Sequence, residues 1–267
     1  MRHEDLVVVV GDCHVGRRTK TYDVQAFRDS VAMLKKNVAE VKAIQNRGIV
    51  FDRMHIFMVG DIVDGEEVYR GQAYEQDAIT IDEMIDVALD EFVGFVDYFA
   101  DNRRFGTGNI TIWCVHGNHG RANRRGSEMA NWDRMFYKLL RQSVGDVAEV
   151  HIADDWYLIA QVRGWQYMLL HGDCIRMYQA IPVYGIQRNV ARWLTGAITE
   201  RFDVVVMGHF HTVIDCWVND IRVLVNGTML PDDRYTQKMA LKPITKYWVF
   251  GVSNDSAVTW QWLVNVR

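Results

Sequence analysis

The chain has 267 residues, 49% of them hydrophobic, which is enough apolar material for a sizeable core. Its 30 Lys and Arg residues against 34 Asp and Glu residues give a net charge of -4, which excludes attraction of nucleic acid by the whole molecule and leaves only local basic patches. The four cysteines form no Cys-x-x-Cys pair, which argues against a zinc knuckle and a secreted disulfide framework. A short polar N-terminus and the lack of a long uncharged apolar run predict a soluble cytoplasmic protein without membrane contact.

The first predicted strand is the apolar run Leu6–Val10, whose lack of polar alternation is typical of a central strand buried on both faces. It ends at Gly11, and Asp12 and His14 follow. Side chains two residues apart on a strand point the same way, so the carboxylate and the imidazole leave the strand end side by side, as half of a metal site. In isolation, a turn cap and an ordinary loop histidine would be the favoured explanation, and only repetition of the pattern reverses that preference.

A helix and a second strand come next. Asp23 is the expected N-cap of a helix whose apolar positions from Phe27 to Val41 alternate spacings of four and three, and residues 46–48 end it. The strand 55–59 then stops at Gly60-Asp61-Ile62-Val63-Asp64-Gly65. A second apolar run therefore ends in a glycine followed by carboxylates, which repeats the layout of the first.

The third predicted strand also ends in a glycine flanked by polar residues. After a surface connection over residues 66–76, an amphipathic helix is expected from Ile81 to Phe99, and the strand 110–115 ends in His116-Gly117-Asn118-His119-Gly120. This β-α-β-α-β order predicts a sheet that is largely parallel at its start, in which ligands bind where the carboxyl ends of the strands meet. The polar residues after the three strands should therefore converge.

A hairpin supplies the fourth polar cluster. Ser127 is expected to start a helix, and the strands 157–162 and 165–170 then form a hairpin that leads into His171-Gly172-Asp173.

The fifth cluster follows a short buried strand. A helix around residues 186–194 precedes the strand 204–207, which ends in Gly208-His209-Phe210-His211. Turn signals and a final strand pair over 248–264 predict a meandering antiparallel sheet for the remainder. No linker or repeat divides the chain, so residues 1–267 are predicted to form a single domain.

The strand ends together carry a mixed set of possible metal ligands: Asp12, His14, Asp61, Asn118, His119, His171, His209 and His211. Carboxylate, amide oxygen and imidazole suit Mn²⁺, Fe²⁺ or Zn²⁺, and the absence of thiolates argues against a structural zinc site. Any single cluster would be read as structural. Five glycine-flanked clusters, each closing an apolar strand, are hard to explain by coincidence.

The blocks Gly-Asp-Cys-His, Gly-Asp-Ile-Val-Asp, Gly-Asn-His, His-Gly-Asp and Gly-His-Phe-His resemble the five signature blocks of the calcineurin-like metallophosphoesterase superfamily, over residues 11–211. The resemblance implies an α/β fold, a four-layer αββα sandwich of two mixed β-sheets flanked by helices. It also implies two divalent ions, with Mn²⁺ as first choice and Fe²⁺, Zn²⁺ or Ni²⁺ as alternatives. One ion would be held by Asp12, His14, Asp61 and His211, and the other by Asp61, Asn118, His171 and His209.

Two ions about 3.5–4 Å apart lower the pKa of a shared water and offset charge on the attacking and leaving oxygens of a phosphoester. His119 is then the expected catalytic residue, as proton donor or transition-state stabiliser. Relatives usually carry an acidic residue at Gly120, so a partner that orients His119 must come from Asp64 or Asp173 or be missing; both acids could equally be solvent-facing turn residues. The other histidines are expected to be structural or at the surface: His3, His55, His116 and His151.

Basic residues follow three of the blocks, and we call this set the arginine collar: Arg17, Arg18, Arg121, Arg124, Arg125, Arg188 and Arg192. Arginine suits bidentate phosphate contact, and the nearby Tyr184 and Trp193 are able to stack on bases. The competing interpretation is that these arginines are solvated or paired with acids.

The opening block, Gly-Asp-Cys-His-Val-Gly, is most similar to that of SbcD-type DNA repair nucleases, although the chain ends too early for their capping domain. Protein phosphatases of the superfamily carry an Arg where this chain has Gly65. The sequence therefore predicts a metal-dependent phosphodiesterase or nuclease, with nucleic acid as substrate and partner and with the oligomeric state left open. The alternatives are a phosphomonoesterase acting on a nucleotide, phosphoprotein or other small substrate, and a metal-dependent binding module without catalysis, for which Gly120 is the only hint.

Overall fold

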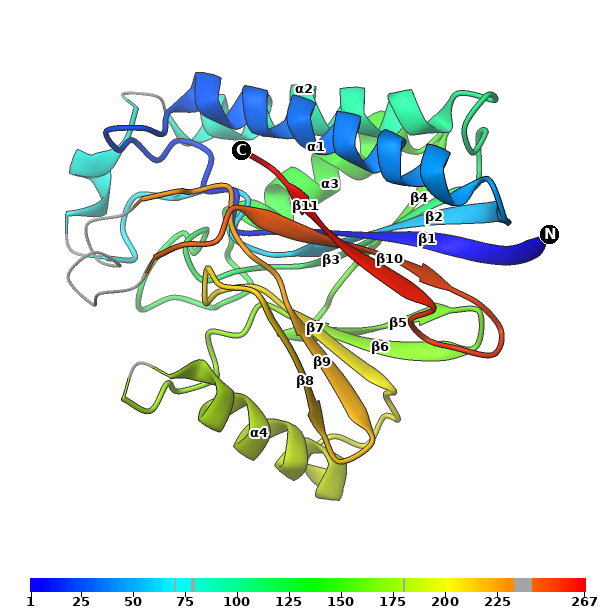
Figure 1. Cartoon of the computed structure of the whole chain (residues 1–267). Helices are drawn as coiled ribbons and strands as arrows, with labels where there is room; N and C mark the ends of the chain where they lie inside the picture. The colour runs from blue at the N-terminus through cyan, green and yellow to red at the C-terminus, as the bar shows by residue number, and fades with distance from the viewer. Residues whose placement is uncertain (70, 78–79, 180, 233–241) are drawn as a thin grey trace.

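The structure, a computed structural model, describes residues 1–69, 71–77, 80–179, 181–232 and 242–267. Within these residues two β-sheets pack face to face, and helices cover the outer face of each, so that the layers follow the order α, β, β, α (Figure 1). This arrangement confirms the predicted α/β sandwich of two mixed sheets.

The first sheet has a parallel part and an antiparallel part. Its parallel strands are β1 (Arg2–Val10), β2 (Ile49–Val59), β3 (Ile110–Val115) and β4 (Ala148–Ile152). Its antiparallel strands are β10 (Lys246–Val252) and β11 (Trp260–Asn265). The strand order is β11-β10-β1-β2-β3-β4.

The second sheet is also mixed, with the order β5-β6-β7-β9-β8. Its strands are β5 (Tyr157–Val162), β6 (Trp165–Leu170), β7 (Val204–Met207), β8 (Ile214–Val218) and β9 (Ile221–Val225). The helices that cover the first sheet are α1 (Val24–Gln45), α2 (Ile81–Ala100) and α3 (Trp132–Val144). The second sheet is covered by α4 (Pro182–Arg192), and short helical turns occur at Gln72–Glu75 and Trp193–Ala197.

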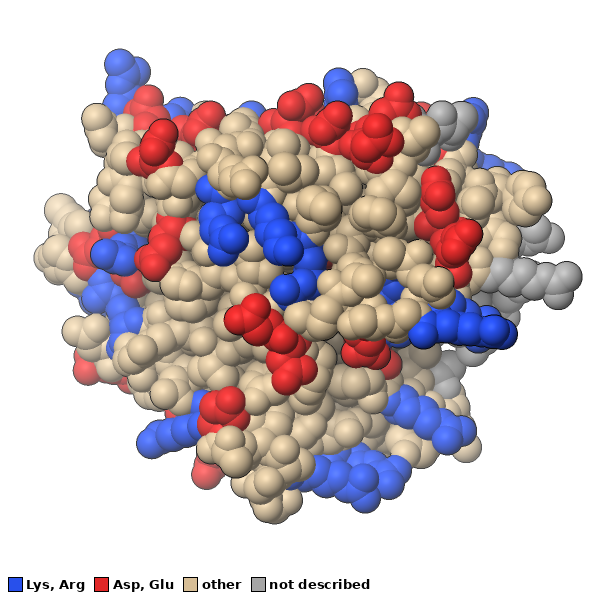
Figure 2. All heavy atoms as spheres, turned by 180° about the vertical axis from the view of Figure 1, so that it is seen from behind, with Lys and Arg blue, Asp and Glu red and all other residues tan. Residues whose placement is uncertain are grey.

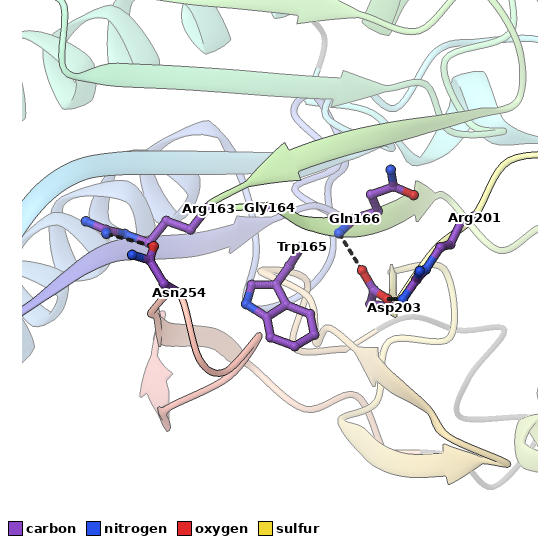
Figure 3. A pocket seen from close by; sticks show the side chains of 7 residues that line it. All are labelled: Arg163, Gly164, Trp165, Gln166, Arg201, Asp203 and Asn254. Carbon is purple, nitrogen blue, oxygen red and sulfur yellow. Dashed lines mark hydrogen bonds and ion pairs between the residues drawn. The ribbon is translucent and has the colours of Figure 1, made fainter.

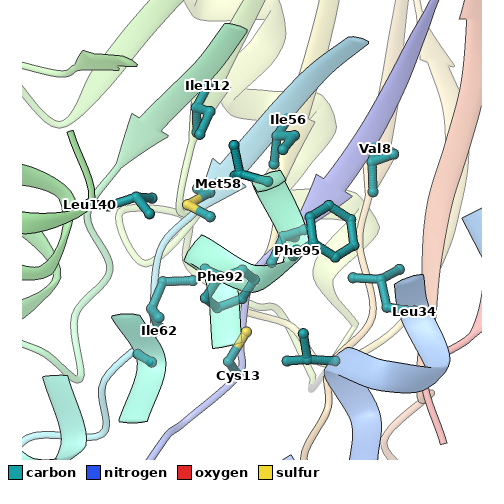
Figure 4. Close-up of a cluster of buried hydrophobic side chains, with 14 of the residues drawn as sticks. Val8, Cys13, Leu34, Ile56, Met58, Ile62, Phe92, Phe95, Ile112 and Leu140 are labelled. Carbon is teal, nitrogen blue, oxygen red and sulfur yellow. The ribbon is translucent and has the colours of Figure 1, made fainter. Parts of the chain in front are cut away.

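Strand β1 is buried on both faces, as its uninterrupted apolar run predicts. Val8 faces the helices, and Val7 and Val9 face the second sheet. Val8 lies opposite Ile56 of β2, which in turn lies opposite Ile112 of β3. Figure 4 shows this row of side chains packed against the helix layer. The register aligns the carboxyl ends of the strands, so the polar residues that follow them reach the same edge of the sheet.

The helix boundaries follow their capping residues. The Asp23 carboxylate accepts a hydrogen bond from the N–H of Ala26 at 2.8 Å, which confirms the predicted start of α1. Helix α3 begins at Trp132, so the predicted start at Ser127 is wrong. Asn131 is the residue with extended backbone whose side chain accepts the N–H of Asp133, and it therefore takes the capping role.

The antiparallel pairs predicted after β7 are present as β8 with β9 and β10 with β11, but they do not form one continuous meander. Strand β7 is parallel to both of its neighbours, β6 and β9, and β10 and β11 return to the first sheet, where β10 pairs with β1. Strand β4 was not predicted, although its residues alternate between apolar and polar as in a half-buried strand. None of the helices in the described part of the chain is long and apolar enough to cross a bilayer.

Candidate metal centre

Three side chains from the ends of β1 and β7 form a first cluster of possible metal ligands. His14 Nε2 and His211 Nε2 lie 2.9 Å apart, and His211 Nε2 lies 3.3 Å from an oxygen of Asp12. Asp12 and His14 are buried, and the three ligand atoms lie within 4.8 Å of one another. Nitrogen and oxygen lone pairs therefore point into one small space.

A second cluster combines the ends of β2, β3, β6 and β7. His171 Nε2 lies 3.0 Å from Asp61 Oδ2 and 3.2 Å from Nδ1 of His209. The other ring nitrogen of His171 lies 2.8 Å from the carbonyl oxygen of Val59, which fixes the direction of Nε2. The Oδ1 atom of Asn118 is buried and has no hydrogen-bond partner in the part of the chain described. A cation at this position would satisfy an acceptor that is otherwise costly to bury.

The backbone is strained where these side chains leave the strands. Asp12, His14, Asp61, His209 and His211 have φ between 50° and 70°, in the left-handed region that residues other than glycine rarely occupy. Such strain persists only where the surrounding structure imposes it, and it concentrates at functional sites.

Glycines in the same blocks make room for the carboxylates. A Cβ atom on Gly117 would lie 2.1 Å from Asp61 Oδ1, and one on Gly208 would lie 2.3 Å from Asp12 Oδ2. Neither position tolerates a side chain without displacing a candidate ligand.

In the second cluster, the Asp61 carboxylate and the His171 imidazole each stabilise the charged form of the other. Burial raises the pKa of Asp61, but the neighbouring His171 and His119 outweigh burial and hold it well below its ordinary value. Burial lowers the pKa of His171, but the Asp61 carboxylate outweighs this and raises it to about 10. A divalent cation would take the place of the His171 proton, so its binding is expected to release a proton.

These residues suit divalent cations. Most of their side chains are buried, and they offer imidazole nitrogens with carboxylate and amide oxygens. Oδ1 of Asn118 also has no hydrogen-bond partner among the described residues. The structure brings together Asp12, His14 and His211 in one group and Asp61, His171 and His209 in another. The assignment of individual residues to individual ions stays a prediction.

His119 lies at the rim of the two clusters, where it forms a third group of possible ligands with His14 and Asp64. Its Nδ1 atom lies 2.8 Å from Asp64 Oδ1, and its ring centroid lies 4.5 Å from that of His14. Burial lowers the pKa of His119, but the carboxylates of Asp61 and Asp64 outweigh burial and raise it. Of the two acids considered as partners of His119, Asp64 is the one in contact, whereas Asp173 accepts a hydrogen bond from Arg121 at 2.8 Å.

The environment of Gly120 explains the missing acidic residue. A Cβ atom there would lie 2.6 Å from Oδ1 of Asn131, because Asn131 and Asp133 occupy the space that a side chain would need. The start of α3 therefore leaves no room for a side chain at residue 120.

Sequence reasoning missed Asp133, which ties the ends of β2 and β3 together. Its buried carboxylate accepts the backbone N–H groups of Asp61, Ile62, Val63 and Gly117 at 2.8–3.0 Å. Burial and the Asp61 carboxylate raise the pKa of Asp133 to about 6, although the N–H groups favour its ionised form. Its sequence position offers no signal, because an acidic residue in the first turn of a helix is common.

Sequence reasoning also missed Tyr69, in the segment predicted only as a surface connection. Its hydroxyl accepts a hydrogen bond from Nδ2 of Asn118, and its ring centroid lies 4.9 Å from that of His119.

The family model for calcineurin-like phosphoesterases matches residues 6–241. The chain belongs to this family. Membership indicates a metal-dependent phosphoric ester hydrolase, in agreement with the two clusters of candidate ligands. A search of the curated proteins finds no match.

Several solved structures resemble this calcineurin-like phosphoesterase over nearly its whole length, at low identity. An archaeal phosphodiesterase is 13% identical, with a TM-score of 0.43 over 97% of this chain and 99% of that one. Vacuolar protein sorting 29 of Cryptosporidium parvum is 13% identical, with a TM-score of 0.44 over 94% and 86%. The E. coli phosphoesterase Yfce is 13% identical, with a TM-score of 0.37 over 97% and 100%. Family membership rests on the sequence match alone.

The arginine collar is partly neutralised by acids. Arg17 is buried and pairs with Glu75 at 2.5 Å and with Asp64 at 3.5 Å. Arg18 lies 3.5 Å from Asp77. Arg121 pairs with Asp173 and also with Glu128. The competing interpretation of paired arginines therefore describes these three residues.

The other four arginines of the collar are exposed and form no ion pair among the described residues. They are Arg124, Arg125, Arg188 and Arg192, of which Arg188 donates a hydrogen bond to the hydroxyl of Tyr178. On the face shown in Figure 2, basic side chains form separate groups interleaved with acidic ones.

The two aromatic residues predicted to stack on bases differ in their exposure to solvent. Tyr184 is 59% exposed, but Trp193 is buried against Trp156 and offers no free ring face, so its predicted role is wrong.

The remaining histidines lie outside both clusters. His55 is buried and lies 3.1 Å from Asp5, and His151 stacks on Trp113. His3 is an exposed partner of Asp52, and His116 is buried.

A hollow of about 280 Å³ at the turn between β5 and β6 lies at the other end of β6 from His171 (Figure 3). Arg163 at its edge pairs with Asp5 and Asp52, and Arg201 lies 3.4 Å from Asp203. The arginines of this hollow are thus paired with acids, and its described residues lack the cluster of metal-ligand atoms found at the metal centre.

Proposed function

We propose that this calcineurin-like phosphoesterase hydrolyses phosphodiester bonds with two divalent ions, Mn²⁺ by preference, and that its substrate is nucleic acid. The observation that carries the proposal is the convergence of two buried ligand clusters with the hydrogen-bonded pair of His119 and Asp64 at their rim.

When bound, two divalent ions would lower the pKa of an attacking water and stabilise the charge on the phosphoryl oxygens. The residues of the chain supply the proton transfer. Because Nδ1 of His119 faces Asp64, its Nε2 atom is the one available to the leaving oxygen. As the oxygen of water bonds to phosphorus and the ester P–O bond breaks, the leaving oxygen takes its proton from His119. The carboxylates of Asp61 and Asp64 raise the pKa of His119, which favours the protonated imidazole.

A diester is favoured over a monoester by the scarcity of unpaired cations at the centre. Gly65, where protein phosphatases carry Arg, has a left-handed backbone, and a Cβ atom there would lie 2.3 Å from the carbonyl oxygen of His119. Arg17 and Arg121, which follow the first and third blocks, are both paired with carboxylates. A dianionic monoester gains most from additional arginine contacts, whereas a diester carries a single negative charge.

The preference for a polymer rests on exposed basic and aromatic residues beyond the ions. Residues 174–199 include three arginines and no acidic residue, and Tyr184, Arg188 and Arg192 are exposed on or next to helix α4. Arg124 and Arg125 add two further exposed cations. Such a mixture of cations and rings is typical of surfaces that bind single strands.

The test compares bis(p-nitrophenyl) phosphate with p-nitrophenyl phosphate at equal Mn²⁺ concentration, followed by labelled single-stranded and double-stranded DNA and RNA. We expect faster turnover of the diester and cleavage of a single-stranded polymer, both abolished by chelation. A faster monoester would overturn the diester assignment, and diester turnover without cleavage of any polymer would overturn the nucleic-acid assignment. His119→Ala serves as the control for contaminating activity.

A further inference from the structure

The Asn118 side chain has two ends, and only one of them can bind a cation. Its Oδ1 atom carries lone pairs, whereas its Nδ2 atom carries hydrogens and repels a positive ion. Rotation of the amide by half a turn would exchange them and destroy the ligand. In the structure Oδ1 is the buried atom without a partner among the described residues, and Nδ2 is the atom engaged in a hydrogen bond. Something must therefore hold the amide in this orientation.

The partner of Nδ2 is the hydroxyl of Tyr69. The phenol oxygen accepts this hydrogen bond and leaves Oδ1 to a cation; a turned amide would accept from the phenol O–H instead and present Nδ2 to the cation, so the hydroxyl and a cation together select the orientation seen here. The Tyr69 ring also packs against His119, with 4.9 Å between centroids and 46° between planes. One side chain thus contacts both a candidate ligand and the candidate proton donor, while 48% of it remains exposed.

The position of Tyr69 is itself fixed by a buried glutamine. Oε1 of Gln72 accepts the backbone N–H groups of Val68 and Tyr69 at 2.9 and 3.1 Å. Nε2 of Gln72 donates to the carbonyl oxygen of Asp64, which belongs to the second signature block. Gln72 is only 2% exposed, so the connection that carries Tyr69 is anchored to the same loop as the metal centre.

We propose that Tyr69 is a positioning residue that sets the orientation of the Asn118 amide, so that Oδ1 faces the cation held with Asp61, His171 and His209. The inference rests on the proposed function in that a divalent cation binds there. Removal of the hydroxyl would leave the NH₂ end without this partner, so the amide would no longer be held with Oδ1 toward the ion. Partners that orient metal ligands in this way typically contribute about 10- to 100-fold to metal affinity.

The experiment titrates the metal-free protein with Mn²⁺ by calorimetry and compares Tyr69→Phe with the wild type. Phenylalanine keeps the ring on His119 and removes only the hydroxyl. We expect one of the two ions to bind about 10- to 100-fold more weakly and the other to be affected little. Tyr74→Phe is the matched control, because Tyr74 belongs to the same connection and is 94% exposed. Two ions that bind Tyr69→Phe within about twofold of wild type would overturn the proposal.

A second background separates orientation from a merely structural role. In Asn118→Asp both ends of the side chain are oxygens, so half a turn changes nothing. Tyr69→Phe should then weaken metal binding far less than in the Asn118 background, and the visible absorption of bound Co²⁺ should change only in the Asn118 background. Equal effects in both backgrounds would show that Tyr69 supports the loop and refute the proposal. Wild-type protein that binds no divalent ion would refute the proposed function as well, whereas two ions bound normally by Tyr69→Phe would refute the role of Tyr69 alone.

Discussion

His119 Nδ1 lies 2.8 Å from Oδ1 of Asp64, and the same carboxylate oxygen lies 3.3 Å from Nδ1 of His14. Asp64 therefore connects the candidate proton donor with a candidate metal ligand. Burial raises the pKa of Asp64, but its hydrogen bonds with the two histidines outweigh burial and hold it well below its ordinary value. This buried acid thus favours its ionised form and, together with Asp61, raises the pKa of His119.

Asp64→Asn is expected to move the alkaline limb of the turnover profile to lower pH. The protonated form of His119 is the active one, and Asp64 raises the pKa of His119, so its removal lets His119 give up the proton at lower pH. The measurement is kcat against pH with a p-nitrophenyl diester. Asp173→Asn is the control, because Asp173 contacts Arg121 instead. An unchanged alkaline limb in Asp64→Asn would contradict the assignment.

His119→Ala is expected to lower turnover by about a hundredfold or more and to leave metal content nearly intact. His119 adjoins a candidate ligand, Asn118, but its own ring contacts Asp64 and lies at the rim. Turnover and metal analysis on the same preparation provide the check. Loss of an ion would make His119 a ligand instead of a proton donor.

Asp61→Asn is expected to damage both metal sites at once, because the resemblance places this carboxylate between the ions. Metal analysis after dialysis measures the effect. Asp220→Asn, in an exposed turn, is the control. Full occupancy by two ions in Asp61→Asn would refute the bridging role.

Asp133→Ala is expected to lower the free energy of unfolding by at least about 3 kcal/mol, because it leaves several buried backbone N–H groups without an acceptor. Urea denaturation of the metal-free protein measures this change. Asp86→Ala, at an exposed position of α2, should change stability far less. Similar destabilisation in the two variants would mean that the Asp133 hydrogen bonds are not stabilising.

Arg124→Ala combined with Arg125→Ala is expected to weaken binding of single-stranded DNA and to flatten its dependence on salt. The slope should fall by up to about 1.4, at about 0.7 for each phosphate that is no longer neutralised. Hydrolysis of a small aryl diester should stay almost unchanged, since it requires only the ions and His119. Equal reduction on both substrates would mean that these arginines support the fold. No reduction on either would return them to the solvated surface and favour a phosphomonoesterase.

The sequence by itself determined the order of strands and helices in the first half and the edge at which the site lies, whereas the four layers were implied by the family resemblance. Uninterrupted apolar runs such as Leu6–Val10 predict strands buried on both faces, and the glycine and polar residues after them predict where side chains converge. These signals are local, because a strand and the residues that follow it are neighbours in the chain. The family match agrees with the same blocks.

Only the tertiary structure decided which residues support that edge. Asp64 and Asp173 were indistinguishable as partners of His119 until their distances were known, and Asp133 and Tyr69 carried no signal in the sequence. The burial of Trp193 and the pairing of β10 with β1 were likewise beyond local patterns. Each of these features joins segments far apart in the chain, and such contacts depend on packing that periodicity and residue type do not encode.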